Sequence, residues 1–104
     1  MILHVCRAEE WAQARASGTY RAESLDSEGF IHFSSWSQLP ATVGRYYAGV
    51  PDLVVLVVDP AGLDVRVEHS PSTRDSFPHL YEPLPAAAVV EVVPLEEALE
   101  RAAG

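Results

Sequence analysis

The sequence contains no lysine and no asparagine, and all seven of its basic residues are arginine. Fifteen acidic residues outnumber them, so the formal net charge is −8 at pH 7. Because this charge repels phosphate, we expect no non-specific binding to nucleic acid or to an anionic membrane. A small-molecule ligand is the expected partner, and a local arginine pocket for a small anion stays open. The residue bias is typical of a GC-rich bacterial genome.

Cysteine and long apolar runs are equally scarce. Cys6 is the only cysteine, which excludes an internal disulfide and makes the cytoplasm the expected location. The N-terminus lacks a signal-peptide pattern, and no apolar run is long enough to cross a membrane. With 104 residues, 48% of them apolar, and no linker-like stretch, the chain is expected to form one domain over residues 1–104. The oligomeric state is left open.

Alternation and chain breakers predict the following elements: strands at residues 2–7, 30–34, 53–58, 63–68 and 87–93, and helices at 8–17, from Ser35 or Ser37 to about 48, and from 94 onward. We expect loops at residues 19–28 and 69–85. The order of these elements predicts a small α+β domain in which short helices flank a mixed sheet. The absence of a glycine-rich phosphate loop argues against a doubly wound nucleotide fold.

Three of the four histidines, His4, His32 and His79, lie in short apolar segments. An imidazole in such a setting costs free energy unless it is hydrogen-bonded or used. We expect the three rings to share one cleft, where histidine chemistry suits proton transfer, metal ligation or recognition of a polar ligand. For His4 a second interpretation stays open, because an isolated histidine on an apolar face is most often bonded to a backbone carbonyl.

Polar and aromatic side chains accompany these histidines. Ser34 follows His32 at strand spacing and so lies on the same face. Phe77 and Tyr81 flank the third histidine in a proline-rich segment that reads as a functional loop. Glu68 ends the predicted strand at residues 63–68 and supplies a carboxylate. These four residues are predicted to line the ligand site.

Three other kinds of chemistry fit less well. The histidines and Glu68 supply enough donors for zinc, but no two histidines have the close spacing of a metal motif, so we expect no metal. Cys6 in a strand is more typical of a small buried side chain than of a nucleophile. Ser34 and Ser35 lack the glycine-rich turn of a serine hydrolase.

The residues singled out so far belong to a wider pattern of positions: His4, Trp11, Gly18, Tyr20, Ser24, Leu25, Glu28 to His32, Ser34 and Phe77 to Tyr81. This pattern closely resembles the bacterial family called domain of unknown function 952, over residues 4–93. The chain departs from that family at Phe33, where members usually carry cysteine, and at Glu82, where they carry glycine. A role for either position is therefore not predicted.

That family is similar to the ADP-ribosyltransferase superfamily, which binds NAD in a cleft between two small sheets. The resemblance implies a split sheet, an ADP-ribosyltransferase-like fold and NAD as the cofactor. It implies that His4 orients the NAD ribose and that His32 faces the nicotinamide. His4, His32 and His79 are then the predicted catalytic residues. The predicted ligand-binding residues are Ser24, Phe30, Ser34, Glu68, Phe77 and Tyr81.

The resemblance implies a small enzyme that uses NAD or ADP-ribose as a transferase or hydrolase acting on a small molecule. Its nearest branch includes RNA 2′-phosphotransferases, but the net charge of −8 argues against an RNA substrate. The alternative is a non-catalytic ligand-binding or regulatory domain of the same fold. A carboxylate within hydrogen-bond reach of the histidines favours catalysis over this alternative.

Overall fold

The computed structural model describes all 104 residues. The chain forms these elements in order: β1 (Ile2–Arg7), α1 (Ala8–Ser17), β2 (Thr19–Tyr20), α2 (Glu23–Ser27), β3 (Ile31–His32), α3 (Leu39–Tyr46), β4 (Leu53–Val58), β5 (Val65–Ser70), β6 (Asp75–Leu80), β7 (Leu84–Pro85), a 3₁₀ turn (Ala86–Ala88), β8 (Val89–Pro94) and α4 (Leu95–Ala103). The predicted α+β class is confirmed. None of the four α-helices combines the length and the hydropathy that a membrane-spanning helix needs.

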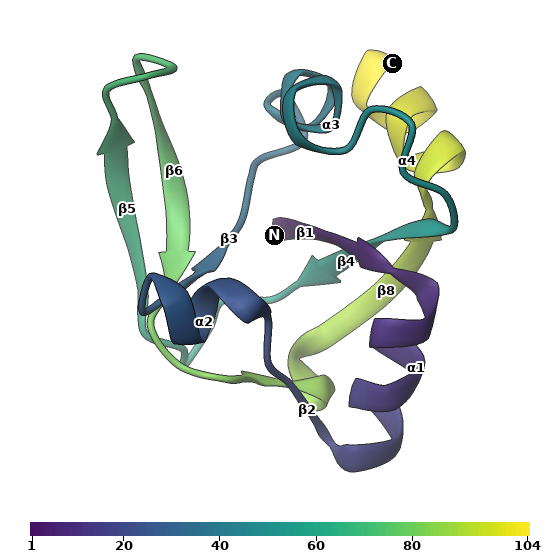
Figure 1. Cartoon of the computed structure of the whole chain (residues 1–104), viewed down its shortest axis with the longest axis vertical. Helices are drawn as coiled ribbons and strands as arrows, with labels where there is room; N and C mark the ends of the chain where they lie inside the picture. Colours follow the sequence, from purple (N-terminus) through teal and green to yellow (C-terminus); the bar gives the residue numbers. More distant parts are fainter.

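The strands form three small sheets, ordered β1-β4-β8, β2-β7 and β3-β6-β5. Every pairing is antiparallel, so the prediction of a mixed sheet is wrong. The helices that separate strands in the sequence suggested parallel crossovers. In the structure, α1 leads into β2 of a different sheet, and the chain returns to the first sheet only at β4, running against β1 (Figure 1).

The two faces of the β1-β4-β8 sheet bury two separate apolar clusters. Alternate residues of β4 serve each one: Leu56 and Val58 pack towards α1 and the two smaller sheets, whereas Val55 and Val57 pack towards α3 and α4. The predicted strand at residues 53–58 is confirmed, and both of its faces are covered. Burial of each such side chain contributes about 1.5–3 kcal/mol. This central strand therefore anchors the whole domain.

The first strand and first helix lie where the sequence predicts them. Gly18 ends α1 with φ of 90°, in the left-handed region, and its N–H bonds to the carbonyl of Ala14. The predicted strand at 30–34 is shorter, since β3 spans two residues and Ser34 forms an isolated bridge with Leu3. The predicted loop at 19–28 contains β2 and α2.

The larger error concerns residues 69–85, predicted as a loop. The segment completes β5, forms β6 and ends in β7. Pro78 does not interrupt β6, because its carbonyl accepts a hydrogen bond from the N–H of Phe33 and its backbone therefore faces β3. The N–H that proline lacks would also face β3, so its absence removes no hydrogen bond between β6 and β5. The resulting β5–β6 hairpin stands to one side of the molecule, across a gap from α3 (Figure 1).

Smaller differences occur at helix ends. Helix α3 begins at Leu39 rather than at Ser35 or Ser37, because residues 35–38 form a turn in which the Ser35 hydroxyl accepts a hydrogen bond from the N–H of Gln38. It ends at Tyr46, short of the predicted 48. The last strand runs two residues later than predicted at its start and includes Pro94.

Candidate functional site

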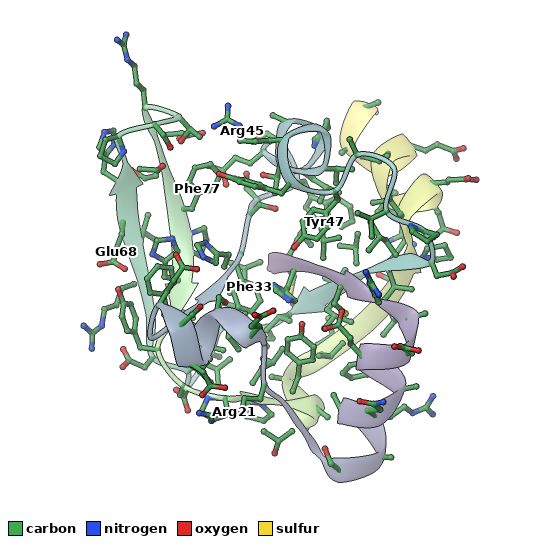
Figure 2. The ribbon with its side chains drawn as sticks, in the orientation of Figure 1. Arg21, Phe33, Arg45, Tyr47, Glu68 and Phe77 are labelled. Carbon is green, nitrogen blue, oxygen red and sulfur yellow. The ribbon has the colours of Figure 1, made fainter.

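A pocket of about 740 Å³ lies between the β5–β6 hairpin, α2, α3 and the outer edge of β1. Its size is within the range usual for small-molecule sites. His4, His32 and His79 all line it, so the three apolar segments of the sequence do meet at one cleft. Figure 2 shows Phe77 on the hairpin side of this space, with Tyr47 below α3 and Phe33 near β1.

His4 is buried, and both of its ring nitrogens are bonded within the protein. Nδ1 donates to the carbonyl of His32 at 2.6 Å, and Nε2 accepts from the Tyr20 hydroxyl at 2.9 Å. Burial lowers the pKa of His4 to about 4, so the ring is neutral at pH 7. His4 therefore ties β1 to β2 and β3, and it has no nitrogen left for a ligand. The structural interpretation of this histidine fits these contacts.

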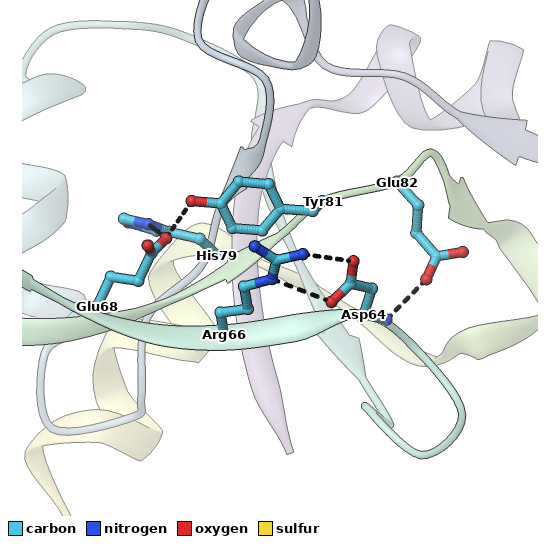
Figure 3. A network of polar contacts seen from close by, with 6 residues as sticks. All are labelled: Asp64, Arg66, Glu68, His79, Tyr81 and Glu82. Carbon is cyan, nitrogen blue, oxygen red and sulfur yellow. Dashed lines mark hydrogen bonds and ion pairs between the residues drawn. The ribbon is translucent and has the colours of Figure 1, made fainter.

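Of the other two histidines in the pocket, His32 and His79, His79 is the more enclosed, with its side chain 13% exposed. Its Nδ1 lies 2.8 Å from Oε1 of Glu68 on the neighbouring strand and donates to that carboxylate. The Tyr81 hydroxyl donates to the same oxygen (Figure 3). The hydrogen bond from Tyr81 and, to a smaller extent, the one from His79 lower the pKa of Glu68 and keep its carboxylate ionised. The Nε2 atom of His79 has no partner in the protein.

Arg66, on β5, packs against the ring of Tyr81. The guanidinium carbon lies 4.3 Å from the centre of the Tyr81 ring, within the range of a cation–π contact. Asp64 bonds the same guanidinium at 3.3 Å through both of its oxygens (Figure 3). The hydrogen bond to Glu68 raises the pKa of Tyr81, so the phenol stays protonated. Asp64 thus holds Arg66, Arg66 packs on Tyr81, and Tyr81 bonds Glu68. Glu68 in turn bonds His79 and orients its ring.

Phe30 covers His79 from the other side. Its ring stacks on the imidazole with 4.0 Å between centroids and 17° between planes. The rings of His32 and His79 stand edge to face, 5.3 Å apart. His32 donates from Nε2 to Glu28 at 2.9 Å, which leaves its Nδ1 without a partner. Two imidazoles, each bonded to a carboxylate, therefore lie side by side with one free nitrogen each.

Burial raises the pKa values of one thiol and two hydroxyl groups that line the pocket. Burial raises the pKa of Cys6 to about 12, so the thiol stays protonated and is no nucleophile at neutral pH. Burial likewise raises the pKa values of Tyr20 and Tyr47. The hydroxyl of Tyr47 donates to the carbonyl of Val5 at 3.3 Å. These groups shape the wall of the pocket rather than supply acid or base.

A tether joins the β5–β6 hairpin to the start of α3. The side-chain amide of Gln38 donates to Oδ2 of Asp75 at 3.0 Å and to the carbonyl of Ser76 at 2.7 Å. The hydrogen bond from Gln38 lowers the pKa of Asp75. The hairpin is therefore held at both ends, by Gln38 near its tip and by β3 at its base.

Most of the predicted site residues line this pocket, namely His4, Ser24, Phe30, His32, Ser34, Phe77 and His79. Glu68 and Tyr81 lie beside it and act on His79 instead. No group of three or more His, Cys, Asp or Glu side chains is arranged to hold a metal ion. Glu91 lies on β8, where it pairs with Arg101 of α4 and takes no part in the pocket.

Sequence reasoning missed most of the other lining residues, among them Glu23, Glu28, Tyr46 and Tyr47. A signal existed for Glu28, whose carboxylate precedes His32 by four residues in the same segment. Tyr46 ends α3 and Tyr47 follows it, away from the histidines in the sequence, and the tertiary fold brings both tyrosines to the pocket. The predicted loop, in contrast, did contain site residues, although it is a strand.

The solved structures similar to this chain include those of protein CC0527 from Caulobacter crescentus. Its crystal structure is 31% identical, covers 95% of this chain and 97% of its own, and superposes with a TM-score of 0.82. The solution NMR structure is 32% identical, with a TM-score of 0.77 over 89% of this chain and 82% of the other. No curated protein matches the sequence. A family model matches residues 5–92. The chain therefore belongs to the family described as protein of unknown function (DUF952).

Proposed function

We propose that this pocket is the active site of a small enzyme that cleaves the bond between ribose and a pyridinium ring in an NAD-type compound. The observation that carries the proposal is the pair of carboxylate-bonded imidazoles. Glu68 lies 2.8 Å from His79 and Glu28 lies 2.9 Å from His32. Carboxylates within hydrogen-bond reach of histidines are the arrangement expected for acid–base catalysis.

The reaction needs a proton acceptor more than a strong nucleophile. In hydrolysis, the bond between ribose C1′ and the ring nitrogen breaks, and its electron pair stays on the nitrogen, which loses its positive charge. Water forms the new bond to C1′ and releases one proton. The free Nε2 of His79 accepts this proton, because Glu68 holds the other nitrogen in its N–H form. With an alcohol in place of water, the same steps give transfer.

The remaining pocket residues suit the nicotinamide riboside half of such a compound. Phe30 and Phe77 offer aromatic faces for the ring, and Ser24 and Ser34 offer hydroxyls for the ribose. The likeness of the histidine pattern to the ADP-ribosyltransferase superfamily supports the same substrate class. In this chain His4 acts through its hold on β3 and Tyr20, as a positioning residue.

One observation favours the second candidate, a non-catalytic ligand-binding domain. His4 makes both of its ring contacts inside the protein, so one of the three histidines is closed to any ligand. A domain of this kind would bind the same compounds and leave them intact. Binding and turnover must therefore be measured separately.

The test compares His79→Ala with His69→Ala, an exposed histidine on the same hairpin that lies outside the pocket. We expect the wild type to release nicotinamide from at least one of NAD, nicotinamide mononucleotide and nicotinamide riboside, as followed by liquid chromatography. Loss of a positioned acid–base group costs about 10²-fold or more in rate, so His79→Ala should lose turnover and His69→Ala should keep it. Calorimetric binding without turnover would support the non-catalytic domain. Absence of binding at millimolar concentration would contradict both.

A further inference from the structure

Negative charge predominates on the wall of the pocket. Glu10, Glu23 and Glu28 line it against a single cation, Arg7. Two of these carboxylates are engaged, by the backbone N–H of Arg7 at 2.9 Å and by His32 at 2.9 Å. Glu23 has no side-chain partner in the protein. Together with the net charge of −8, this wall repels a phosphate group and attracts a positive charge.

Aromatic side chains make up much of the remaining wall. Tyr46 from α3 and Phe77 from β6 line the pocket, and neither ring pairs with another aromatic side chain. Tyr46 is 64% exposed, although it is a large apolar side chain. The faces of aromatic rings attract organic cations, and cages of such rings bind quaternary nitrogen. Carboxylates and aromatic faces thus favour the same kind of ligand.

A serine in the wall of the pocket supplies the third observation. Ser34 as a residue is 3% exposed and lines the pocket. Its backbone N–H and carbonyl each bond to Leu3 at 2.8 Å. Its hydroxyl makes no hydrogen bond within the protein, and it is open to the pocket rather than sealed in the core. Its placement beside His32 suits a hydroxyl group of a ligand.

From these contacts we infer that the preferred substrate is a pyridinium nucleoside without a phosphate. This inference rests on the proposed function and narrows its substrate class. The cationic ring lies among the aromatic side chains and the carboxylates, and the sugar hydroxyls face Ser34. Each added phosphate meets the carboxylates of Glu10 and Glu23 and weakens binding. NAD, whose diphosphate carries negative charge, is therefore the poorer ligand.

The experiment measures dissociation constants by calorimetry for nicotinamide riboside, nicotinamide mononucleotide, NAD and ADP-ribose, at low and at physiological salt. We expect affinity to fall in that order, with riboside about tenfold tighter than NAD at low salt. Higher salt should narrow this difference, because it screens charges near the surface. Glu23→Gln should also reduce the difference in affinity between nicotinamide riboside and NAD. Glu96→Gln, the same change on α4 outside the pocket, should leave it unchanged.

The outcomes separate this inference from the proposed function. If NAD binds more tightly than the riboside and is cleaved, the proposed function stands and the inferred preference is overturned. If riboside binds most tightly but Glu23→Gln and Glu96→Gln behave alike, the wall charge does not set the preference, and the inference fails. If none of the four compounds binds, the proposed function fails and this inference fails with it.

Discussion

His79 and Glu68 lie diagonally across the β5–β6 ladder, with Nδ1 of the imidazole 2.8 Å from Oε1 of the carboxylate. The register sets this contact, since Glu68 pairs with Phe77 and Arg66 pairs with His79. Diagonal neighbours on one face of a sheet are within reach of long side chains. A slip of one residue would turn the carboxylate to the opposite face. Residues 69–85, which sequence analysis predicted as a loop, thus supply the strand that brings His79 to Glu68.

The first prediction concerns the carboxylate of this pair. Glu68→Gln should lower kcat on the cleaved compound by about 10- to 100-fold and leave KM nearly unchanged, because Glu68 orients His79 without lining the pocket. Steady-state kinetics measures both constants. Glu82→Gln is the matched control, since Glu82 bonds the backbone N–H of Asp64 and does not touch His79. An equal loss in both variants would show that Glu68 has no special role.

The second prediction concerns stability at acid pH. The pKa of His4 is about 4 in the folded protein and 6.5 in the reference state, so the unfolded chain takes up a proton first as pH falls. The unfolded state binds more protons in this window, so the free energy of unfolding decreases as pH falls from 7 to 5. The decrease is about 2 kcal/mol, because one pKa unit is equivalent to about 1.4 kcal/mol.

Urea denaturation at pH 7 and pH 5 measures this decrease. His69→Gln, which changes an exposed histidine on the hairpin, should show the same pH dependence as the wild type. A wild-type stability that is unchanged between the two pH values would mean that His4 is not held neutral in the fold.

The third prediction concerns the hydroxyl that supports His4. Tyr20→Phe keeps the buried ring but leaves Nε2 of His4 without its donor. An unpaired buried acceptor costs about 1–3 kcal/mol of unfolding free energy. Urea denaturation at pH 7 measures the loss. Tyr46→Phe removes the hydroxyl of an exposed tyrosine and should change stability by less than about 0.5 kcal/mol. If both variants were equally stable, the contact between His4 and Tyr20 would carry no energy.

Local signals in the sequence were sufficient to predict an element whose bounds depend only on its own residues. The apolar run Leu53–Val58 and the Gly18 stop are examples, and both were predicted within their observed bounds. The three histidine segments were also found from local composition, since each sets a polar ring among apolar neighbours. Their meeting in one pocket needed the tertiary structure, because β1, β3 and β6 are far apart in the chain.

Other features depended on pairing that local patterns do not encode. The prolines at 71, 78, 83 and 85 indicate a loop, yet Pro78 lies in β6 with its backbone facing β3. The role of Glu68 depends on strand register, and that of Tyr46 on the position of α3 across the pocket. The antiparallel sheets likewise follow from chain direction, which the order of helices and strands leaves undetermined.

The most direct test of the central claim is chemical-shift mapping of the backbone amides during titration with nicotinamide riboside. We predict saturable shifts on three walls of the pocket, at His32 and Ser34, at Phe77 and His79, and at Tyr46. The amides of α4, on the far side of the β1-β4-β8 sheet, should not move. Shifts confined to α4 or spread evenly over the surface, or no shifts at millimolar concentration, would contradict the account.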